Sequence, residues 1–283
     1  MKQTSEILSE FENQLRRKGS SDNTILSYLS AVRQYFSMYD ELSTQNLRAY
    51  RDYLLNTYSP NTVNSRIQGI NCYLKNSAKL PPNFVMERLD SYRLPSVREQ
   101  QKSFLDNTIS NNDYKRFKNS LKRHGQMYWY FVIRFLAATG ARISELIQIK
   151  MEHLNLGYMD LYSKGGKIRR IYFPDTLCLE ASQWFHSQGV SAGFLFVNSK
   201  GVPMSPRGIS CRLKKLARQH RIPPETVYPH SFRHRFAKNF LQRFNDISLL
   251  ADLMGHESIE TTRIYLTRSA REQKELIDKI VIW

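Results

Sequence analysis

Apolar side chains in the first hundred residues recur every three or four positions, in four successive segments. Such spacing puts them on one face of a helix. Ser21 or Asp22 can cap the second helix, and Ser59 followed by a proline is typical of a helix start. We therefore predict a small four-helix bundle, with its third helix near 44–57 and its fourth near 60–78. The apolar positions of the first two helices are Ile7, Leu8, Phe11, Leu15, Ile25, Tyr28, Leu29, Val32 and Phe36.

The pattern changes twice after residue 80. Helical periodicity is lost between Pro81 and Lys102, and a second helical series opens at Ser110. Residues 158–162 and 168–173 are rich in aromatic and β-branched side chains and flank a Gly-Gly turn, which is typical of a β-hairpin. We predict a mainly α protein, with an N-terminal four-helix domain and an α+β domain that contains a small antiparallel sheet.

These changes also give the predicted domain boundaries. The helical domain covers residues 1–95, a linker covers 96–105, and the α+β domain covers 106–270. The C-terminal tail, 271–283, is expected to be helical, and contact with another protomer is one way to cover its apolar face, which is too large to leave in water. Packing of the tail on its own domain is the alternative. That face consists of Leu276, Ile277, Ile280 and Trp283.

The composition favours an intracellular protein. The chain has 283 residues, 41% of them apolar, which is enough for two ordinary cores. No run approaches the ~20 apolar residues of a membrane span, and the N-terminal residues lack the apolar stretch of a signal peptide. Cys72, Cys178 and Cys211 are too few and too scattered for a disulfide framework or a metal cage. We therefore expect a cytoplasmic protein in a reducing compartment.

The net charge of +17 is unevenly distributed. Residues 1–100 carry 13 Lys and Arg against 10 Asp and Glu, whereas residues 101–283 carry 29 against 15. A field of this sign attracts polyanions, and nucleic acid is the expected partner. The alternative is a basic charge that only keeps the protein soluble.

Six side chains in the second domain form a candidate catalytic set. The first arginine follows a glycine break in TGARISEL, and the lysine lies in the hairpin turn SKGGK. The second arginine lies three residues after a histidine, on the same helical face. A second histidine follows a glycine that can end a helix, and we expect the next segment, SIETTRIYL, to be a helix that carries the tyrosine. The set is Arg142, Lys164, His230, Arg233, His256 and Tyr265.

These residue types together suit phosphoryl transfer. Two arginines can clamp the oxygens of one phosphate and stabilise the charge that builds there during reaction. A tyrosine hydroxyl can act as the nucleophile. Its reference pKa is about 10, so ionising it at pH 7 costs roughly 4 kcal/mol, and a histidine that accepts the proton avoids much of that cost. A lysine can protonate the leaving 5′-oxygen. Because the phosphotyrosine keeps the bond energy, this scheme needs neither ATP nor a metal.

Each residue taken singly also has a plainer explanation. Tyr265 could be a packing residue, Arg142 could pair with Glu145 at the surface, and His230 could cap a helix. His256 could simply follow a helix end, and the hairpin lysines could be solvated turn residues. His234 fits a structural role better than that of a proton carrier. The order of the whole set is what favours catalysis.

That order resembles the tyrosine recombinase (phage integrase) family. The motifs that carry the resemblance are TGARISEL, SKGGKIRR, YPHSFRHRFA and LMGHESIETTRIY, in this sequence order. The resemblance covers nearly all of 106–270, and the N-terminal helices look like the core-binding domain of the family. The short two-domain chain is similar to transposon resolvases and chromosome-dimer recombinases.

The resemblance implies a role for each motif residue. Arg142 and Arg233 would clamp the phosphate, and Tyr265 would be the nucleophile. His230 would be the general base, and His256 would hold the scissile phosphate by a hydrogen bond. Lys164 would be the general acid, with Lys167 as the alternative, and Glu145 would support the active-site arginine and histidine. Neither a cofactor nor a metal is implied.

The resemblance also implies an assembly and a reaction. Two domains would close around double-stranded DNA, and four protomers would join two sites and exchange strands through a Holliday junction. We expect a mobile element as the source of the chain, and integration, excision and cointegrate resolution all stay open. The alternatives are DNA relaxation like that of a type IB topoisomerase and a non-catalytic DNA-binding regulator.

Overall fold

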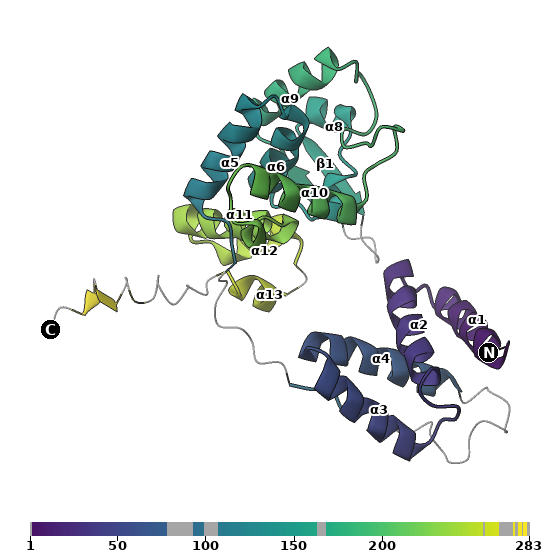
Figure 1. The fold of residues 1–283 in the computed structure, drawn as a ribbon. Helices are drawn as coiled ribbons and strands as arrows, with labels where there is room; N and C mark the ends of the chain where they lie inside the picture. Colours follow the sequence, from purple (N-terminus) through teal and green to yellow (C-terminus); the bar gives the residue numbers. More distant parts are fainter. Residues whose placement is uncertain are drawn as a thin grey trace. The chain divides into compact units, whose positions relative to one another are not determined.

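The computed structural model describes residues 2–77, 93–98, 107–162, 168–256 and 258–265, together with residues 274, 277, 278, 280 and 281. The chain divides into two compact units, Met1–Gln101 and Lys102–Trp283 (Figure 1). Each unit has its own hydrophobic core. The prediction of a mainly α protein with one small antiparallel sheet is confirmed.

The first unit contains the four predicted helices. Ser21 caps α2 by accepting a hydrogen bond from the Thr24 amide, and Ser43 caps α3 in the same way through the Asn46 amide. The apolar faces of the helices meet in one core, in which α2 packs against α1 and α4. The helices are α1 (Lys2–Arg17), α2 (Asp22–Phe36), α3 (Thr44–Thr57) and α4 (Pro60–Ser77).

Two asparagines of α4 hold the segment 93–98 against the first unit. The Asn71 side chain both donates to the carbonyl of Leu94 and accepts from its amide, at 3.0 and 2.9 Å. Asn64 forms the same pair of bonds with Val97, at 2.9 and 2.8 Å. Residues 96–98 of the predicted linker therefore lie on the first unit, and its remaining residues are outside the described ones.

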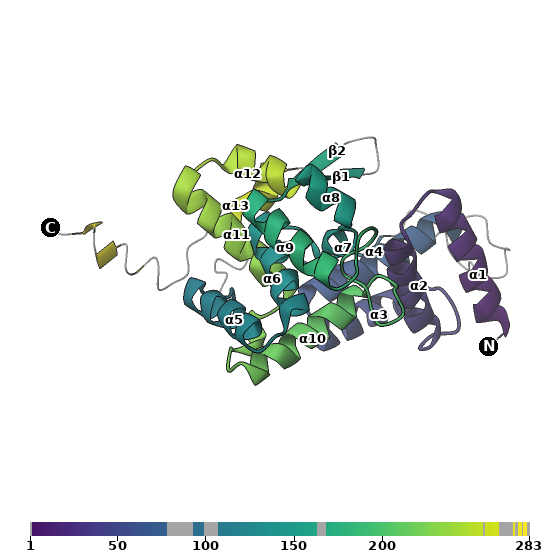
Figure 2. The same ribbon diagram turned by 90° about the horizontal axis from the view of Figure 1, so that it is seen from above.

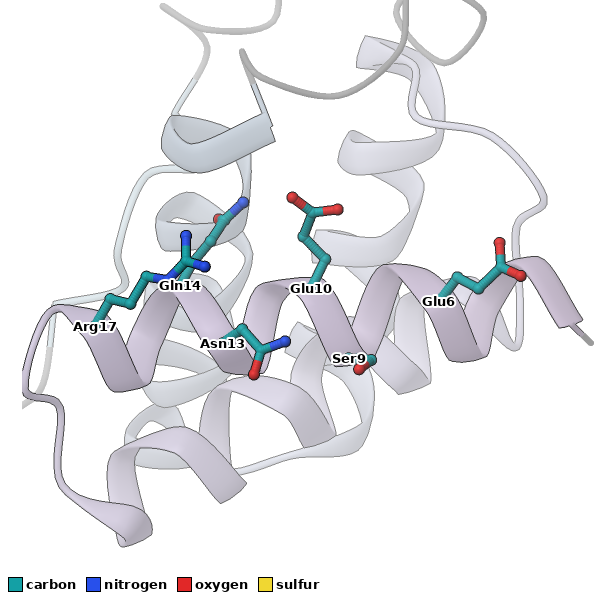
Figure 3. Close-up of a pocket in the computed structure, with 6 residues that line it drawn as sticks. All are labelled: Glu6, Ser9, Glu10, Asn13, Gln14 and Arg17. Atoms are coloured by element: carbon teal, nitrogen blue, oxygen red, sulfur yellow. The ribbon is translucent and has the colours of Figure 1, made fainter.

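A shallow polar hollow on the first unit is lined by one helix alone. Figure 3 shows its side chains, which come from successive turns of α1 and are mostly exposed. They lie on the same helix as Phe11 and Leu15, which point into the core. None of the predicted site residues lies here. The lining residues are Glu6, Ser9, Glu10, Asn13, Gln14 and Arg17.

The second unit is built around α6 (Met127–Thr139). This helix is apolar on most of its sides, as expected for a buried helix, and it packs against α5, α7, α9 and α11. The other elements are α5 (Asn111–Arg123), α7 (Ile143–Leu146), α8 (Met151–Leu156), β1 (Tyr158–Tyr162), β2 (Ile168–Tyr172), α9 (Asp175–Ser187), α10 (Pro206–Gln219), a 3-10 helix (Pro224–Thr226), α11 (Pro229–Phe244), α12 (Ile247–Met254) and α13 (Ile259–Arg263).

The predicted hairpin is present as an antiparallel pair of strands. Tyr158 lies opposite Tyr172, and Tyr162 lies opposite Ile168. Met159 and Ile171 are buried on one face, whereas Tyr162, Ile168 and Tyr172 are exposed on the other. This alternation is the strand periodicity that the sequence indicated. Figure 2 shows the hairpin beside α12, with which β2 is in contact.

One local prediction is wrong. The segment SIETTRIYL does not form a helix as far as Tyr265, because α13 begins after its cap Ser258 and ends at Arg263. Tyr265 lies in the turn that follows, where its amide donates to the carbonyl of Thr262 at 3.0 Å. A helix of five residues is too short to be stable alone, and α13 is in contact with α12.

A search of the described helices finds none long and apolar enough to cross a membrane.

Candidate active site

Five of the six predicted catalytic residues lie in the described part of the second unit. Arg142 is at the start of α7, His230 and Arg233 are in the first turns of α11, and His256 follows α12. Tyr265 follows α13. Figures 1 and 2 show α11, α12 and α13 grouped together, and contacts join α6 to α11, α11 to α12 and α12 to α13. The fold thereby brings these side chains to one region.

Arg142 is fixed by the glutamate three residues later. Its amide donates to Glu145 Oε2 at 2.7 Å, and its Nη1 donates to Glu145 Oε1 at 2.8 Å. Nη2 also reaches the carbonyl of Gly255 at 3.3 Å. The Arg142 side chain keeps 37% of its surface exposed. The predicted support of Arg142 by Glu145 is thus matched by direct contacts, and the guanidinium remains open to solvent.

Arg233 is the most deeply buried of these cations, with 2% of its surface exposed. Its Nη1 donates to the carbonyl of Gly140 and its Nη2 to that of Met254, both at 2.6 Å. Nη2 also lies 2.9 Å from His256 Nε2. Burial and the charge of Arg142 together lower the pKa of Arg233 to about 10. These hydrogen-bond partners are all neutral, so among the described residues no carboxylate pairs directly with this buried charge.

His256 bridges Arg233 and α13. An arginine can only donate, so His256 Nε2 accepts from Arg233, and Nδ1 carries the ring proton. Nδ1 lies 2.7 Å from the hydroxyl oxygen of Thr262, to which it donates. Burial and the charges of Arg233 and Arg142 lower the pKa of His256 to about 4. The ring is therefore neutral at pH 7.

Tyr265 packs between histidines and a small apolar cluster. Its ring stacks on His256 with centroids 6.1 Å apart and lies 5.4 Å from the ring of His234. Leu241, Leu250 and Met254 belong to the same cluster, and the tyrosine is 7% exposed. Burial raises the pKa of Tyr265, while the charge of Arg233, a hydrogen bond with it and the charge of Arg142 act in the opposite direction.

The two histidines of α11 differ in their surroundings. His230 is exposed, and partial desolvation together with the charges of Arg233 and Arg142 lowers its pKa. His234 lies one turn later, with its ring centroid 6.4 Å from that of His230. Its Nδ1 is buried and finds no hydrogen-bond partner among the described residues. Burial lowers the pKa of His234 to about 4, so this ring is also neutral at pH 7.

Arg169 is a member of this cluster that sequence reasoning missed. It lies on β2, and its Nη1 donates to Glu145 Oε1 at 2.6 Å. Its Nε and Nη2 both donate to the carbonyl of Leu253, at 3.0 and 2.9 Å. Alternation along β2 already placed Arg169 on the same face as the buried Ile171. A charged residue at an inward position was the available signal, although its partners could not be named.

Lys164 and Lys167 lie outside the described residues. In the sequence both lysines fall between Tyr162, the last residue of β1, and Ile168, the first residue of β2. Within the described part of the chain, no group of three or more His, Cys, Asp or Glu side chains is arranged to hold a metal ion.

The arrangement can bind and polarise a phosphate group. Arg142 offers an exposed guanidinium, Arg233 adds a buried one, and His256 and Tyr265 lie against the latter. Because the cations are fixed by backbone and carboxylate contacts, little reorganisation is needed when negative charge develops nearby.

Comparison with known proteins identifies relatives over almost the whole chain. A tyrosine recombinase XerA of Pyrococcus furiosus is 28% identical over 282 residues, which cover 97% of this chain and 94% of the relative. A TnP I resolvase of Bacillus thuringiensis is 24% identical over 295 residues, which cover 96% and 99%.

Solved structures show the same fold. A XerH site-specific recombinase bound to a palindromic difH substrate has a TM-score of 0.72 at 19% identity, covering 96% of this chain and 84% of that one. A lambda integrase dimer bound to a COC' core site has a TM-score of 0.68 at 14% identity, covering 92% and 94%. The model of the phage integrase family matches residues 107–272, which is more than half of the chain. The chain therefore belongs to the phage integrase family, the family of the tyrosine recombinases.

Proposed function

We propose that the protein is a site-specific DNA recombinase that cleaves and rejoins DNA through a covalent bond between Tyr265 and a 3′-phosphate. The observation that carries this proposal is the contact of Tyr265 with Arg233, a buried guanidinium whose hydrogen-bond partners are neutral. A phosphate placed there would meet a buried cation that has no direct ion pair among the described residues, beside a tyrosine hydroxyl. This combination suits covalent phosphoryl transfer.

The proposal assigns one role in the reaction to each residue of the site. Arg142 and Arg233 bind the non-bridging oxygens of the scissile phosphate. His230 is exposed and has a lowered pKa, so at pH 7 it has a free nitrogen to accept the Tyr265 proton. Lys164 in the hairpin turn protonates the leaving 5′-oxygen, with Lys167 as the alternative. His256 holds the phosphate.

The DNA substrate and the assembly are part of the same proposal. Related proteins are named as recombinases and a resolvase, and two structures of similar fold are bound to DNA sites. The surplus of basic residues in 101–283 suits a duplex partner. We propose a homotetramer on two recombination sites, which exchanges strands through a Holliday junction and acts in the cytoplasm at the nucleoid.

The remaining segments receive roles in that assembly. We propose that residues 1–95 form a core-binding domain, that 96–105 link it to the catalytic domain 106–270, and that the tail 271–283 contacts a neighbouring protomer. In the tail, the described side chains of Ile277, Ile280 and Val281 are exposed, which leaves apolar surface for a partner. A mobile element is the proposed source of the gene.

The test is attachment of DNA that survives denaturation. Wild type and Tyr265→Phe are compared on DNA that flanks the gene and on unrelated DNA of equal length. Tyr128→Phe serves as the matched control, because its hydroxyl donates to the carbonyl of Val197 and to none of the site residues. We expect an adduct on the flanking DNA with wild type and Tyr128→Phe, and none with Tyr265→Phe.

Other outcomes identify the alternatives. Equal adducts on both DNAs would indicate relaxation like that of a type IB topoisomerase. Tight binding without any adduct would indicate a DNA-binding regulator. An adduct formed by Tyr265→Phe would refute the assignment of the nucleophile.

A further inference from the structure

We propose that Arg169 is a positioning residue that ties the base of the hairpin to the Arg142–Glu145 pair and to the end of α12. Through these ties it holds the hairpin and His256 in place relative to the phosphate clamp. The inference rests on the proposed function, because it describes how that site is kept in its working geometry.

The Arg169 guanidinium joins three separate parts of the unit. It extends from β2, it donates once to Glu145 of α7, and it donates twice to the carbonyl of Leu253 near the end of α12. Its side chain is only 12% exposed. The acceptors are 24 and 84 residues away in sequence, so these bonds are tertiary contacts and serve no local turn or cap.

Close packing at Gly255 strengthens the connection to α12. Gly255 has a positive φ of 60° and ends the helix. A Cβ at this position would lie 2.2 Å from Cδ of Arg169, so the arginine occupies the space that a side chain would need. The carbonyl of Gly255 accepts from Arg142, and the next residue is His256. Arg169 therefore lies against the turn that presents both of these groups.

Arg169 also determines how Glu145 is shared. Burial raises the pKa of Glu145, but Arg169 and Arg142 outweigh it, and the pKa is lowered overall. Arg233 and His230 of α11 are the further charged or titratable groups that act on this carboxylate. Without Arg169, the single negative charge would pair with Arg142 alone. That stronger pairing would compete with the phosphate for the Arg142 guanidinium.

The shape of the side chain is part of the proposal. A guanidinium is a planar fork that can donate to a carboxylate and a carbonyl at the same time, whereas a lysine presents one compact charge. The neighbouring Arg170 shows the contrast. It points to the other face of the hairpin, pairs with Asp160 at 2.7 Å and stacks on Tyr158, and its side chain is 41% exposed. Arg170 thus supplies a matched control on the same strand.

The experiment measures DNA binding and adduct formation separately, with the full chain. Arg169→Ala, Arg169→Lys and Arg170→Ala are compared with wild type in single-turnover assays at saturating DNA. We expect Arg169→Ala to slow adduct formation by about 10- to 100-fold, as is usual for residues that orient catalytic groups, with DNA affinity nearly unchanged. Arg169→Lys should recover only part of the rate, and Arg170→Ala should leave it unchanged.

A second readout does not require catalysis. The charge of Arg169 is one of the causes that lower the pKa of His256, so its removal should raise that pKa from about 4. Nuclear magnetic resonance titration of the His256 ring would detect the change in Arg169→Ala, and Arg170→Ala should titrate like wild type. Arg169→Lys keeps the charge, so its His256 should titrate like wild type, and its rate of adduct formation carries the test if the alanine variant does not fold.

The outcomes separate this inference from the proposed function. Absence of a Tyr265-dependent adduct in wild type would overturn the proposed function, while the His256 titration would still test the contact of Arg169. Normal adduct formation by wild type and equally fast formation by Arg169→Ala would overturn the inference alone. A lysine variant as fast as wild type would also overturn it, because the fork would then be unnecessary.

Discussion

The two units both bury a tyrosine hydroxyl near an arginine, but the hydroxyls have different partners. In the first unit, Tyr50 donates to Gln34 Oε1 at 2.9 Å, with the carbonyl of Ala31 3.3 Å away. Burial raises the pKa of Tyr50 to about 12, although Arg66 acts in the opposite direction. In the second unit, Tyr265 faces Arg233 and Arg142 and packs against two neutral histidines.

The comparison shows that a buried tyrosine is not reactive by burial alone. Desolvation disfavours the phenolate in both units. In the first unit the hydroxyl has amide and carbonyl acceptors, which favour the neutral form and fix the helices together. In the second unit the nearby groups are two cations and rings that are neutral at pH 7. Such surroundings can stabilise negative charge on a phenolate or on a phosphate.

The largest expected effect comes from removing Arg233, and Arg66 is the corresponding arginine of the first unit. Arg233→Ala should reduce the rate of adduct formation by roughly 10³ or more, because it removes charge that stabilises the transition state. Arg66→Ala, at the tyrosine of the first unit, should leave the rate of folded protein unchanged. Single-turnover cleavage at saturating DNA measures both. Equal losses of rate in the two variants would mean that Arg233 contributes no more to catalysis than Arg66 does.

A second prediction concerns the leaving group, for which the first unit has no counterpart. Lys164→Ala should slow cleavage by about 10²–10⁴, the usual contribution of a general acid. The rate should recover on DNA whose 5′-oxygen at the scissile bond is replaced by sulfur, since a thiolate leaves without protonation. Lys167→Ala is the matched control. Recovery with sulfur in that variant instead would assign the acid to Lys167.

A third prediction is that the two hydroxyls contribute to different properties, that of Tyr50 to stability and that of Tyr265 to cleavage. Tyr50→Phe should lower the free energy of unfolding by about 0.5–1.5 kcal/mol, because the amide of Gln34 loses a partner, and adduct formation should persist. Tyr265→Phe should abolish the adduct with little loss of stability. Denaturant unfolding together with the attachment assay measures both. A Tyr265→Phe variant that is the less stable of the two would contradict the comparison.

The smallest expected effect is a pH dependence confined to the second unit. All seven histidines of the chain lie beyond residue 101, and the pKa values of His234 and His256 are lowered to about 4. The unfolded chain then binds more protons between pH 6.5 and 4, so stability falls as pH drops through this range. Thermal unfolding should show a lower midpoint at pH 5 than at pH 7 for the second unit, by roughly 2–4 °C for each kcal/mol of stability lost.

The control for this effect is His234→Phe, which should reduce the fall because one of the two neutral rings is gone. An equal fall in the transition of the first unit would show that the histidines are not its cause.

Much of the fold could be predicted because the signals are local. Ser21 and Ser59 mark helix starts, Gly255 marks a helix end, and the Gly-Gly turn marks the hairpin. The end of α13 could not be predicted, because no residue that typically ends a helix lies between Ser258 and Tyr265, although the helix ends at Arg263.

The candidate site could likewise be predicted only in part. Arg142, Arg233, His256 and Tyr265 could be selected from the order of their motifs, and the fold gathers them. Arg169 could not be given a role, since its acceptors on α7 and α12 are distant in sequence and one of them is a main-chain carbonyl. Every residue has a main-chain carbonyl, so the sequence does not show which of them accepts a hydrogen bond from a side chain.

The hydrogen bonds of His256 have a consequence for how the site receives its substrate. With its proton on Nδ1, the ring has none on Nε2 to give to a phosphate. The Thr262 hydroxyl, however, can donate as well as accept. If Arg233 donates to a phosphate in place of Nε2, the ring can take the tautomer with its proton on Nε2, and the Thr262 hydroxyl can then donate a hydrogen bond to Nδ1. Arg233 donates in both arrangements and only the bond between His256 and Thr262 reverses, so the engaged and the empty site differ in the tautomer of His256 and not in proton count.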